Sequence, residues 1–179
     1  TPFAADAITA NPFLGSDSLQ PFFETAKEHN KGIFILVKTS NPASGEFQDL
    51  ICGEKKLYEI IAEKTHAWGK DFVGKKGYSA IGAVVGATFP HEISALRKIM
   101  PMAYFLVPGY GAQGAAAKDI EYCFNSDGLG AIINASRSIL YAYNVSPWKE
   151  KYGICAWKEA TQKAVITMNE EIRKISKSY

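Results

Sequence analysis

The sequence has little of what disulfide, metal or membrane chemistry requires. Its three cysteines, Cys52, Cys123 and Cys155, lie far apart, are odd in number and show no CxxC spacing. Neither a disulfide framework nor a zinc site is therefore expected, and this cysteine usage indicates a reducing cytoplasm. The three histidines are equally scattered and imply no metal. No apolar run approaches the roughly 18 residues of a membrane span, and no signal peptide is recognisable, so we expect a soluble protein.

An excess of charge is absent too. The 179 residues include 20 basic and 18 acidic side chains, and the resulting net charge of +2 is too balanced for a protein that binds nucleic acid or a membrane surface. We therefore expect small molecules or other protein surfaces as partners. An apolar content of 47%, with 12% aromatic residues, is enough to build the core of one domain.

Apolar runs alternate with amphipathic stretches along the chain. The strand-like runs lie near residues 6, 33, 81, 104 and 131. The expected helices cover residues 16–30, 55–68, 91–99, 138–143 and, as a long last helix, 147–176. Ser16 or Asp17 is expected to cap the first of them, and Ser146 to cap the last, with Pro147 in its first turn. This repeated order, with strands apolar on both faces, predicts an α/β fold with a parallel sheet.

Five strand-helix units are compatible with two architectures. One is a doubly wound open sheet, and the other is the last five of the eight units of a (β/α)8 TIM barrel, whose complete form needs about 250 residues. Polar residues favour the barrel, because Asn11, Ser40, Thr88, the 108–114 loop and Arg137 all follow the carboxyl ends of predicted strands. Every candidate site residue would then lie on one rim.

The first residues bear on the extent of the domain. Thr1 is not an initiating methionine, and a mostly buried strand is predicted to begin within a few residues of it. We therefore expect a truncated chain in which residues 1–179 form the carboxyl-terminal part of a single barrel domain and the N-terminal strands are missing. Such a segment would expose two long strand edges, so we expect it not to be stable as a lone monomer.

Two successive strand-to-helix turns have features that suit an anion. One runs from Pro108 to Gly114 and the other from Asn134 to Arg137. Glycines allow backbone N–H groups to approach a ligand closely, the start of a helix adds a positive dipole end, and an arginine supplies a bidentate fork for phosphate. The alternative is two ordinary turns that need glycine and happen to precede an arginine.

Five motifs, each at a predicted strand end, carry a family resemblance. In order they are 6–15 (DAITANPFLG), 39–42 (TSNP), 84–90 (VVGATFP), 107–114 (VPGYGAQG) and 134–139 (NASRSI). Together they resemble orotidine 5'-phosphate decarboxylase in its longer bacterial-type branch. The resemblance implies a homodimeric, cytoplasmic (β/α)8 barrel lyase that uses no cofactor. Its nucleotide substrate, orotidine 5'-monophosphate, would be converted to UMP and CO2 in de novo pyrimidine biosynthesis.

The resemblance also implies roles for particular residues. Ser40 would hydrogen-bond the pyrimidine ring, Gln113 would bridge the pyrimidine carbonyl and the phosphate, and Arg137 would bind the phosphate together with nearby backbone N–H groups. The substrate-binding set that follows is Asn11, Ser40, Pro108, Gly109, Gly111, Gln113, Gly114, Ser136 and Arg137. Taken by themselves, Ser40 could cap a turn, Gln113 could face solvent, and Asn11 and Thr88 could make structural hydrogen bonds only.

The family's catalytic lysine and its Asp-x-Lys-x-x-x-Asp array have no counterpart here. Lys70-Asp71 lies in a polar loop and Lys118-Asp119 opens a helical segment. We therefore expect no catalytic residue in this chain, a lysine and aspartate array N-terminal to Thr1, and an inactive isolated segment. Two alternatives stay open: another phosphate-binding barrel enzyme that acts on a sugar phosphate, and a non-catalytic fragment that binds phosphorylated ligands.

Overall fold

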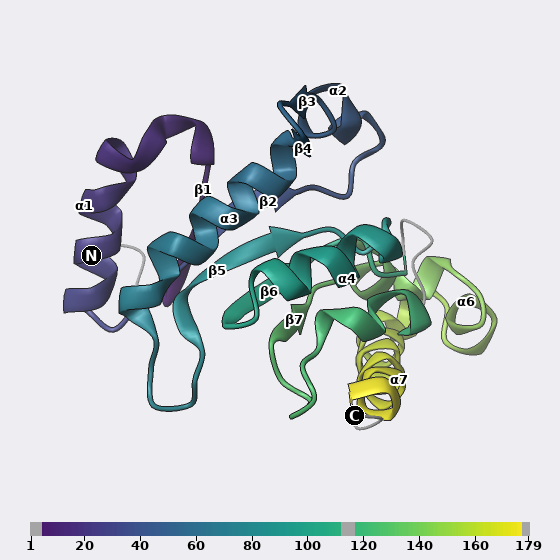
Figure 1. Ribbon diagram of the computed structural model, residues 1–179. Helices are drawn as coiled ribbons and strands as arrows, with labels where there is room; N and C mark the ends of the chain where they lie inside the picture. The colour runs from purple at the N-terminus through teal and green to yellow at the C-terminus, as the bar shows by residue number, and fades with distance from the viewer. Residues whose placement is uncertain (1–4, 112–116, 177–179) are drawn as a thin grey trace.

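A five-stranded parallel sheet is the centre of the protein in a computed structural model, which describes residues 5–111 and 117–176 (Figure 1). Its strand order is β1-β2-β5-β6-β7, and every neighbouring pair is parallel. The strands are β1 (Ala7–Ala10), β2 (Gly32–Lys38), β5 (Ser79–Val85), β6 (Ala103–Val107) and β7 (Ala131–Ile133). The predicted α/β class, its parallel sheet and the five strand positions are thereby confirmed.

Helices of very different length connect these strands. The longer ones are α1 (Gly15–Glu28), α3 (Leu57–Gly69), α4 (Pro90–Ile99) and α7 (Trp157–Ser176), and the single turns are α2 (Gly45–Gln48), α5 (Arg137–Leu140) and α6 (Trp148–Lys151). The 3-10 helices are η1 (Pro12–Leu14), η2 (Pro42–Ser44), η3 (Lys70–Phe72), η4 (Ala117–Cys123), η5 (Ala142–Asn144) and η6 (Ile154–Ala156). No helix within the described ranges is both long and apolar enough to cross a bilayer.

The predicted regularity of the strand-helix units is only partly present. In the described part of the chain, the segment between β6 and β7 contains the 3-10 helix η4 instead of an α-helix. The connection from β2 to β5 includes a short antiparallel pair that was not predicted, β3 (Ile51–Cys52) and β4 (Lys55–Lys56). Because Lys55 and Lys56 belong to this pair, α3 begins at Leu57, where the carboxylate of Glu59 accepts a hydrogen bond from the backbone N–H of Lys56 at 2.7 Å.

The predicted cap of the first helix is wrong. Helix α1 begins at Gly15, its N-cap is Leu14, and no side chain makes a capping hydrogen bond there. The Ser16 hydroxyl instead accepts a hydrogen bond from the Trp68 indole at 3.2 Å, which joins α1 to α3. A long-range partner has therefore replaced the local one.

The predicted single helix over residues 147–176 is also wrong. Helix α6 ends before Gly153, the 3-10 helix η6 follows, and α7 begins only at Trp157. The Ser146 hydroxyl donates to Glu150 at 2.5 Å and does not cap the long helix. Helix α7 buries Ala160 and Ala164, because small side chains allow the preceding short helices to approach its backbone closely.

The two faces of the sheet differ in how far they are covered. On one face, buried side chains of β2, β5 and β6 share a single core with α1, α3 and α4. On the other face Phe34 and Leu36 of β2 are only half-buried, and Ile132 of the edge strand β7 is 47% exposed. Strand β2 is therefore fully covered on one face, whereas the sequence predicted cover on both. We call the second side of the sheet the open face.

Candidate functional site

The predicted site residues follow the carboxyl ends of strands that lie side by side. Because all five strands are parallel, these ends share one edge of the sheet. Backbone hydrogen bonds link consecutive loops along it: Gly86 N–H donates to the Lys38 carbonyl and Ala87 N–H to the Pro108 carbonyl, both at 2.8 Å. This carboxyl edge is the natural place for a site in a parallel α/β sheet.

Ser40 lies at the carboxyl edge just beyond β2, half-buried. Its backbone carbonyl accepts a hydrogen bond of 3.5 Å from the Thr88 hydroxyl. The N-cap of the following 3-10 helix is Asn41, so the turn-capping explanation for the Ser40 hydroxyl does not hold. Within the part of the chain that the structure describes, no hydrogen-bond partner is found for this hydroxyl.

Asn11 follows β1 and has a structural function. Its side-chain oxygen accepts a hydrogen bond from the backbone N–H of Phe13 at 3.1 Å, which caps the 3-10 helix η1. The structural hydrogen bond that the sequence analysis considered for Asn11 is thus confirmed for this oxygen. A contact between Asn11 and a ligand stays a prediction.

The loop after β6 has a special backbone conformation and is anchored by one buried side chain. Gly109 and Gly111 have φ angles of 103° and 71°, which side chains other than glycine rarely adopt. Between them Tyr110 is buried, and its hydroxyl donates a hydrogen bond to Glu171 of α7 at 2.5 Å. Burial, reinforced by this bond, raises the pKa of Tyr110. Helix α7 therefore anchors the loop, a function that the sequence did not suggest.

Gln113 and Gly114, two further predicted site residues, lie outside the described residues. Pro108 is described, and its carbonyl joins the hydrogen-bonded chain of loops along the carboxyl edge. The bridging role of Gln113 therefore stays a prediction.

Arg137 follows β7, where it is exposed at the first position of α5. Together with Gly111 and Ser138 it lines a hollow of about 620 Å³. The Ser138 hydroxyl is buried and has no hydrogen-bond partner among residues 5–111 and 117–176, and a Cβ atom on Gly111 would lie 3.1 Å from it. Ser136 precedes α5, and its side chain makes no capping hydrogen bond. The glycine-rich loop and the arginine, predicted as two halves of an anion site, are thus neighbours.

The ring-contacting and phosphate-contacting candidates lie on different strands. Ser40 follows β2 and Arg137 follows β7, with β5 and β6 between them. At ordinary strand spacing three steps across a sheet correspond to roughly 14 Å, and curvature of the sheet shortens this separation. The carboxyl edge therefore offers two separated polar points, as an elongated ligand with unlike ends requires.

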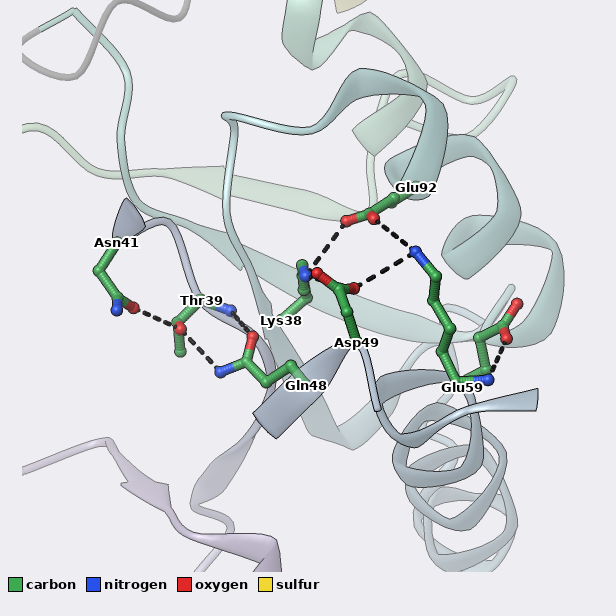
Figure 2. A network of polar contacts seen from close by, with 8 residues as sticks. Lys38, Thr39, Asn41, Gln48, Asp49, Glu59 and Glu92 are labelled. Carbon is green, nitrogen blue, oxygen red and sulfur yellow. Dashed lines mark hydrogen bonds and ion pairs between the residues drawn. The ribbon is translucent and has the colours of Figure 1, made fainter. Parts of the chain in front are cut away.

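A buried lysine next to Ser40 was missed by sequence reasoning (Figure 2). Lys38 is 1% exposed, and its ammonium lies 2.9 Å from Asp49 and 3.6 Å from Glu92. It also lies over the rings of Tyr58 and Phe89, at 5.0 and 4.8 Å from their centroids.

Two features explain why this charge is tolerated. The register of β2 against β5 shifts between Leu36 and Lys38, and the Lys38 side chain meets residues of α3 and α4. The hydrogen bond from Lys38 lowers the pKa of Asp49, which is therefore ionised at neutral pH and balances the ammonium. In the described ranges no group of three or more His, Cys, Asp or Glu side chains lies so as to hold a metal ion.

Comparison with known proteins gives consistent matches. The model of the "Orotidine 5'-phosphate decarboxylase / HUMPS family" matches residues 1–151. The orotidine 5'-phosphate decarboxylase of Caldicellulosiruptor bescii is 52% identical over 141 residues, which are 79% of this chain and 46% of that protein. That of Rhodopirellula baltica is 42% identical over 177 residues, 97% of this chain and 57% of that protein.

A solved structure agrees with these sequence matches. The OMP decarboxylase of Leishmania donovani superimposes with a TM-score of 0.69 and 35% sequence identity, covering 96% of this chain and 58% of that one. The chain spans about half the length of the curated relatives it matches.

Proposed function

The chain belongs to the orotidine 5'-phosphate decarboxylase / HUMPS family, and on that premise we propose that it is the carboxyl-terminal part of an enzyme that decarboxylates orotidine 5'-monophosphate to UMP and CO2. In this proposal the chain supplies contacts to both ends of the nucleotide. Ser40 would contact the pyrimidine ring. The 108–114 loop, Ser136 and Arg137 would hold the phosphate.

One observation carries the proposal. Ser40, with an unpartnered hydroxyl among the described residues, and Arg137, beside the glycine-rich loop, follow different strands of one parallel sheet at the same edge. A guanidinium and backbone N–H groups suit a phosphate dianion, and a single hydroxyl suits a carbonyl or imide group of a base. The distance between the two points favours a ligand with a polar group at each end.

The open face supports the barrel architecture over a doubly wound sheet. A doubly wound sheet has helices on both faces, whereas the core described above joins α1, α3 and α4 to one face. The half-buried Phe34 and Leu36 would then point into the barrel interior, and the edge strands β1 and β7 would pair with further strands. An apolar hollow of about 700 Å³ beside β1, lined by Ile8, Phe22 and neighbours, fits the same arrangement. We propose that N-terminal barrel strands complete the domain.

The chemistry explains why the chain would hold the binding half of the site only. Loss of CO2 leaves a carbanion on the ring, which a nearby ammonium must stabilise and protonate. Lys38 does not fit this task, because its ammonium is paired with carboxylates and enclosed by aromatic rings on the helix-covered side. The phosphate contacts, remote from the bond that breaks, would contribute by fixing the ring in place.

The proposal is tested with the full-length gene product. Orotidine 5'-monophosphate is added without metal or organic cofactor, and the fall in its absorbance is followed. Steady decarboxylation is expected, together with UMP binding in calorimetry. UMP binding without decarboxylation would favour a non-catalytic phosphate-binding protein, and tighter binding of sugar phosphates than of UMP would favour another phosphate-binding barrel enzyme.

Two further properties implied by the family resemblance stay predictions. One is a homodimer, which light scattering of the full-length gene product measures directly. The other is that the 179-residue segment alone is inactive, since the lysine and aspartate array is expected elsewhere in the protein. Both can be examined with the preparation used for the decarboxylation assay.

A further inference from the structure

Thr39, the residue before Ser40, makes two hydrogen bonds to the side chain of Gln48 and one to that of Asn41, the residue after Ser40. The backbone N–H of Thr39 donates to the side-chain oxygen of Gln48 at 3.0 Å, and the side-chain nitrogen of Gln48 donates to the Thr39 hydroxyl at 2.8 Å (Figure 2). The Thr39 hydroxyl in turn donates to the side-chain oxygen of Asn41 at 2.6 Å. The residues before and after Ser40 are therefore joined by a side-chain hydrogen bond, and the first of them is held by Gln48.

The direction of these hydrogen bonds is fixed. A hydroxyl has one proton, and that of Thr39 is donated to Asn41, so Thr39 can only accept from Gln48. A backbone N–H can only donate, so the Gln48 oxygen must face it. Gln48 uses one donor and one acceptor at the same neighbour, and no other uncharged side chain of this shape satisfies both.

The opposite side of Ser40 is equally restricted. A Cβ atom on Gly86 would lie 2.7 to 2.8 Å from the backbone nitrogen, Cα and Cβ of Ser40, closer than atoms can approach. The end of β5 is thus in direct contact with Ser40, and Thr88 adds the bond to its carbonyl. The Thr39-Ser40 segment therefore lies between Gly86, which follows β5, and Gln48 at the end of α2. The hydroxyl of Ser40 itself has no partner among the described residues.

The end of α2 is itself fixed in the fold. Asp49, the residue after Gln48, forms the 2.9 Å ion pair with buried Lys38, the residue before Thr39. Two adjacent residues of one segment therefore contact two adjacent residues of the other. The ion pair fixes the segment as a whole, whereas the amide of Gln48 sets the orientation of the peptide that leads into Ser40.

From this geometry we propose that Gln48 is a positioning residue that orients Ser40 toward the base of the bound nucleotide. The inference rests on the proposed function, because it takes Ser40 as the contact to the ring. It extends that function by assigning selectivity for the base to a side chain that touches no ligand. Phosphate contacts at the β7 end of the sheet should be independent of Gln48.

The test compares two ligands with and without a base. UMP and ribose 5-phosphate are titrated into the full-length gene product and into its Gln48→Met variant, which keeps the side-chain length and removes both hydrogen bonds. We expect UMP affinity to fall about tenfold, the value of one lost hydrogen bond to the ring, and ribose 5-phosphate affinity to change by less than about twofold. Unchanged binding of the second ligand also reports that the variant is folded.

Three further variants separate positioning from a general structural effect. Gln20→Met, on the exposed face of α1, is the matched control and should leave both affinities unchanged. Gln48→Glu retains the acceptor for the Thr39 N–H and should recover part of the UMP affinity. The double variant Ser40→Ala with Gln48→Met should bind UMP no more weakly than Ser40→Ala alone, since Gln48 acts through Ser40.

Two results would overturn the inference while leaving the proposed function intact. One is an equal loss of UMP and ribose 5-phosphate affinity in Gln48→Met, and the other is full UMP affinity in that variant. A different result would overturn both together: an unmodified protein that binds UMP no better than ribose 5-phosphate has no contact to the base for Gln48 to position.

Discussion

Two buried cations lie at opposite ends of the same sheet and are stabilised in different ways. Lys38, at the carboxyl edge, is paired with the side-chain carboxylates of Asp49 and Glu92. Arg97, 8% exposed at the amino edge, donates to the backbone carbonyls of Met100 and Ala103 at 2.9 and 2.8 Å. The helix α4 carries both Glu92 in its first turn and Arg97 in its last.

Arg97 joins several elements at once. Besides those two carbonyls it reaches the carbonyls of Cys123 and Gly130 at 2.7 and 2.8 Å, and its guanidinium lies 3.6 Å over the Phe105 ring. Burial lowers the pKa of Arg97 to about 10, which leaves it charged at neutral pH. One side chain thus joins four carbonyls from the ends of α4 and η4 and the starts of β6 and β7.

The difference shows how the two edges divide their tasks. Backbone carbonyls cannot be exchanged by mutation, so the partners of the cation at the amino edge are the same whatever side chains the sequence carries there. The carboxyl edge balances charge with side chains, which can be exchanged, and leaves a hydroxyl and a guanidinium available to a ligand. Substitutions at the amino edge should therefore change stability, and substitutions of the accessible side chains of Ser40 and Arg137 at the carboxyl edge should change binding.

The largest effect is expected for Arg97→Met. Four carbonyls would lose a charged donor, of which those of Met100 and Gly130 keep a backbone donor, and the free energy of unfolding should fall by about 4 kcal/mol. Urea denaturation measures this change, with Arg173→Met on the exposed side of α7 as the matched control. UMP affinity of the folded protein should be retained, and a selective loss of UMP binding without loss of stability would contradict the division of tasks.

Arg137→Ala should show the opposite behaviour. Removal of a charge-assisted contact to the phosphate should weaken UMP binding by about 3 kcal/mol. The free energy of unfolding should change by less than about 0.5 kcal/mol, because the side chain is exposed. Calorimetry with UMP and urea denaturation give the two numbers, and an unchanged dissociation constant would remove Arg137 from the site.

Lys38→Met sharpens the comparison because it tests a buried charge at the carboxyl edge. The variant leaves Asp49 and Glu92 only the ammonium of the more exposed Lys56, at 3.4 and 3.6 Å, and the free energy of unfolding should fall by about 2 kcal/mol. This is less than for Arg97, since the Asp49 and Glu92 side chains are 34% and 19% exposed and water can solvate them in part. A loss as large as that of Arg97→Met would mean that both edges are equally structural.

The smallest effect is a pH dependence of the same ion pair. The folded protein lowers the pKa of Asp49, so the stability from this carboxylate is fully present above its ordinary pKa of about 3.9. It is lost as the pH falls from there through the lowered pKa. Unfolding of the unmodified protein and of Asp49→Asn should therefore differ more at pH 7 than at pH 3. An equal difference at both pH values would contradict the assignment.

Local pattern predicted the strands better than the helix ends. Unbroken apolar runs such as Gly32–Lys38 are typical of strands in a covered parallel sheet, and all five strand positions were found. Ser16 and Ser146 failed as caps because each hydroxyl found another partner, a distant one for Ser16 and Glu150 for Ser146. Composition did not show that the break after α6 would divide the predicted last helix.

Sequence reasoning likewise found some residues of the candidate site and missed others. The positions of Ser40, Gly109, Gly111 and Arg137 beyond strand ends were predicted correctly, because a parallel sheet brings such ends together. Lys38, Gln48 and the link from Tyr110 to α7 were missed, since each depends on a side-chain contact between different elements, separated by as little as 9 residues for Gln48 and by 61 for Tyr110. No periodicity signals such a contact, and a lysine that ends a strand resembles any solvated one.

The contact between Gly86 and Ser40 limits how selectivity can be changed by directed evolution. Even one added methyl group at position 86 would collide with the serine backbone, so the serine cannot be shifted sideways by gradual substitution at that strand end. A library that aims at a different base should therefore randomise position 40 together with the residues that hold it, and keep position 86 as glycine.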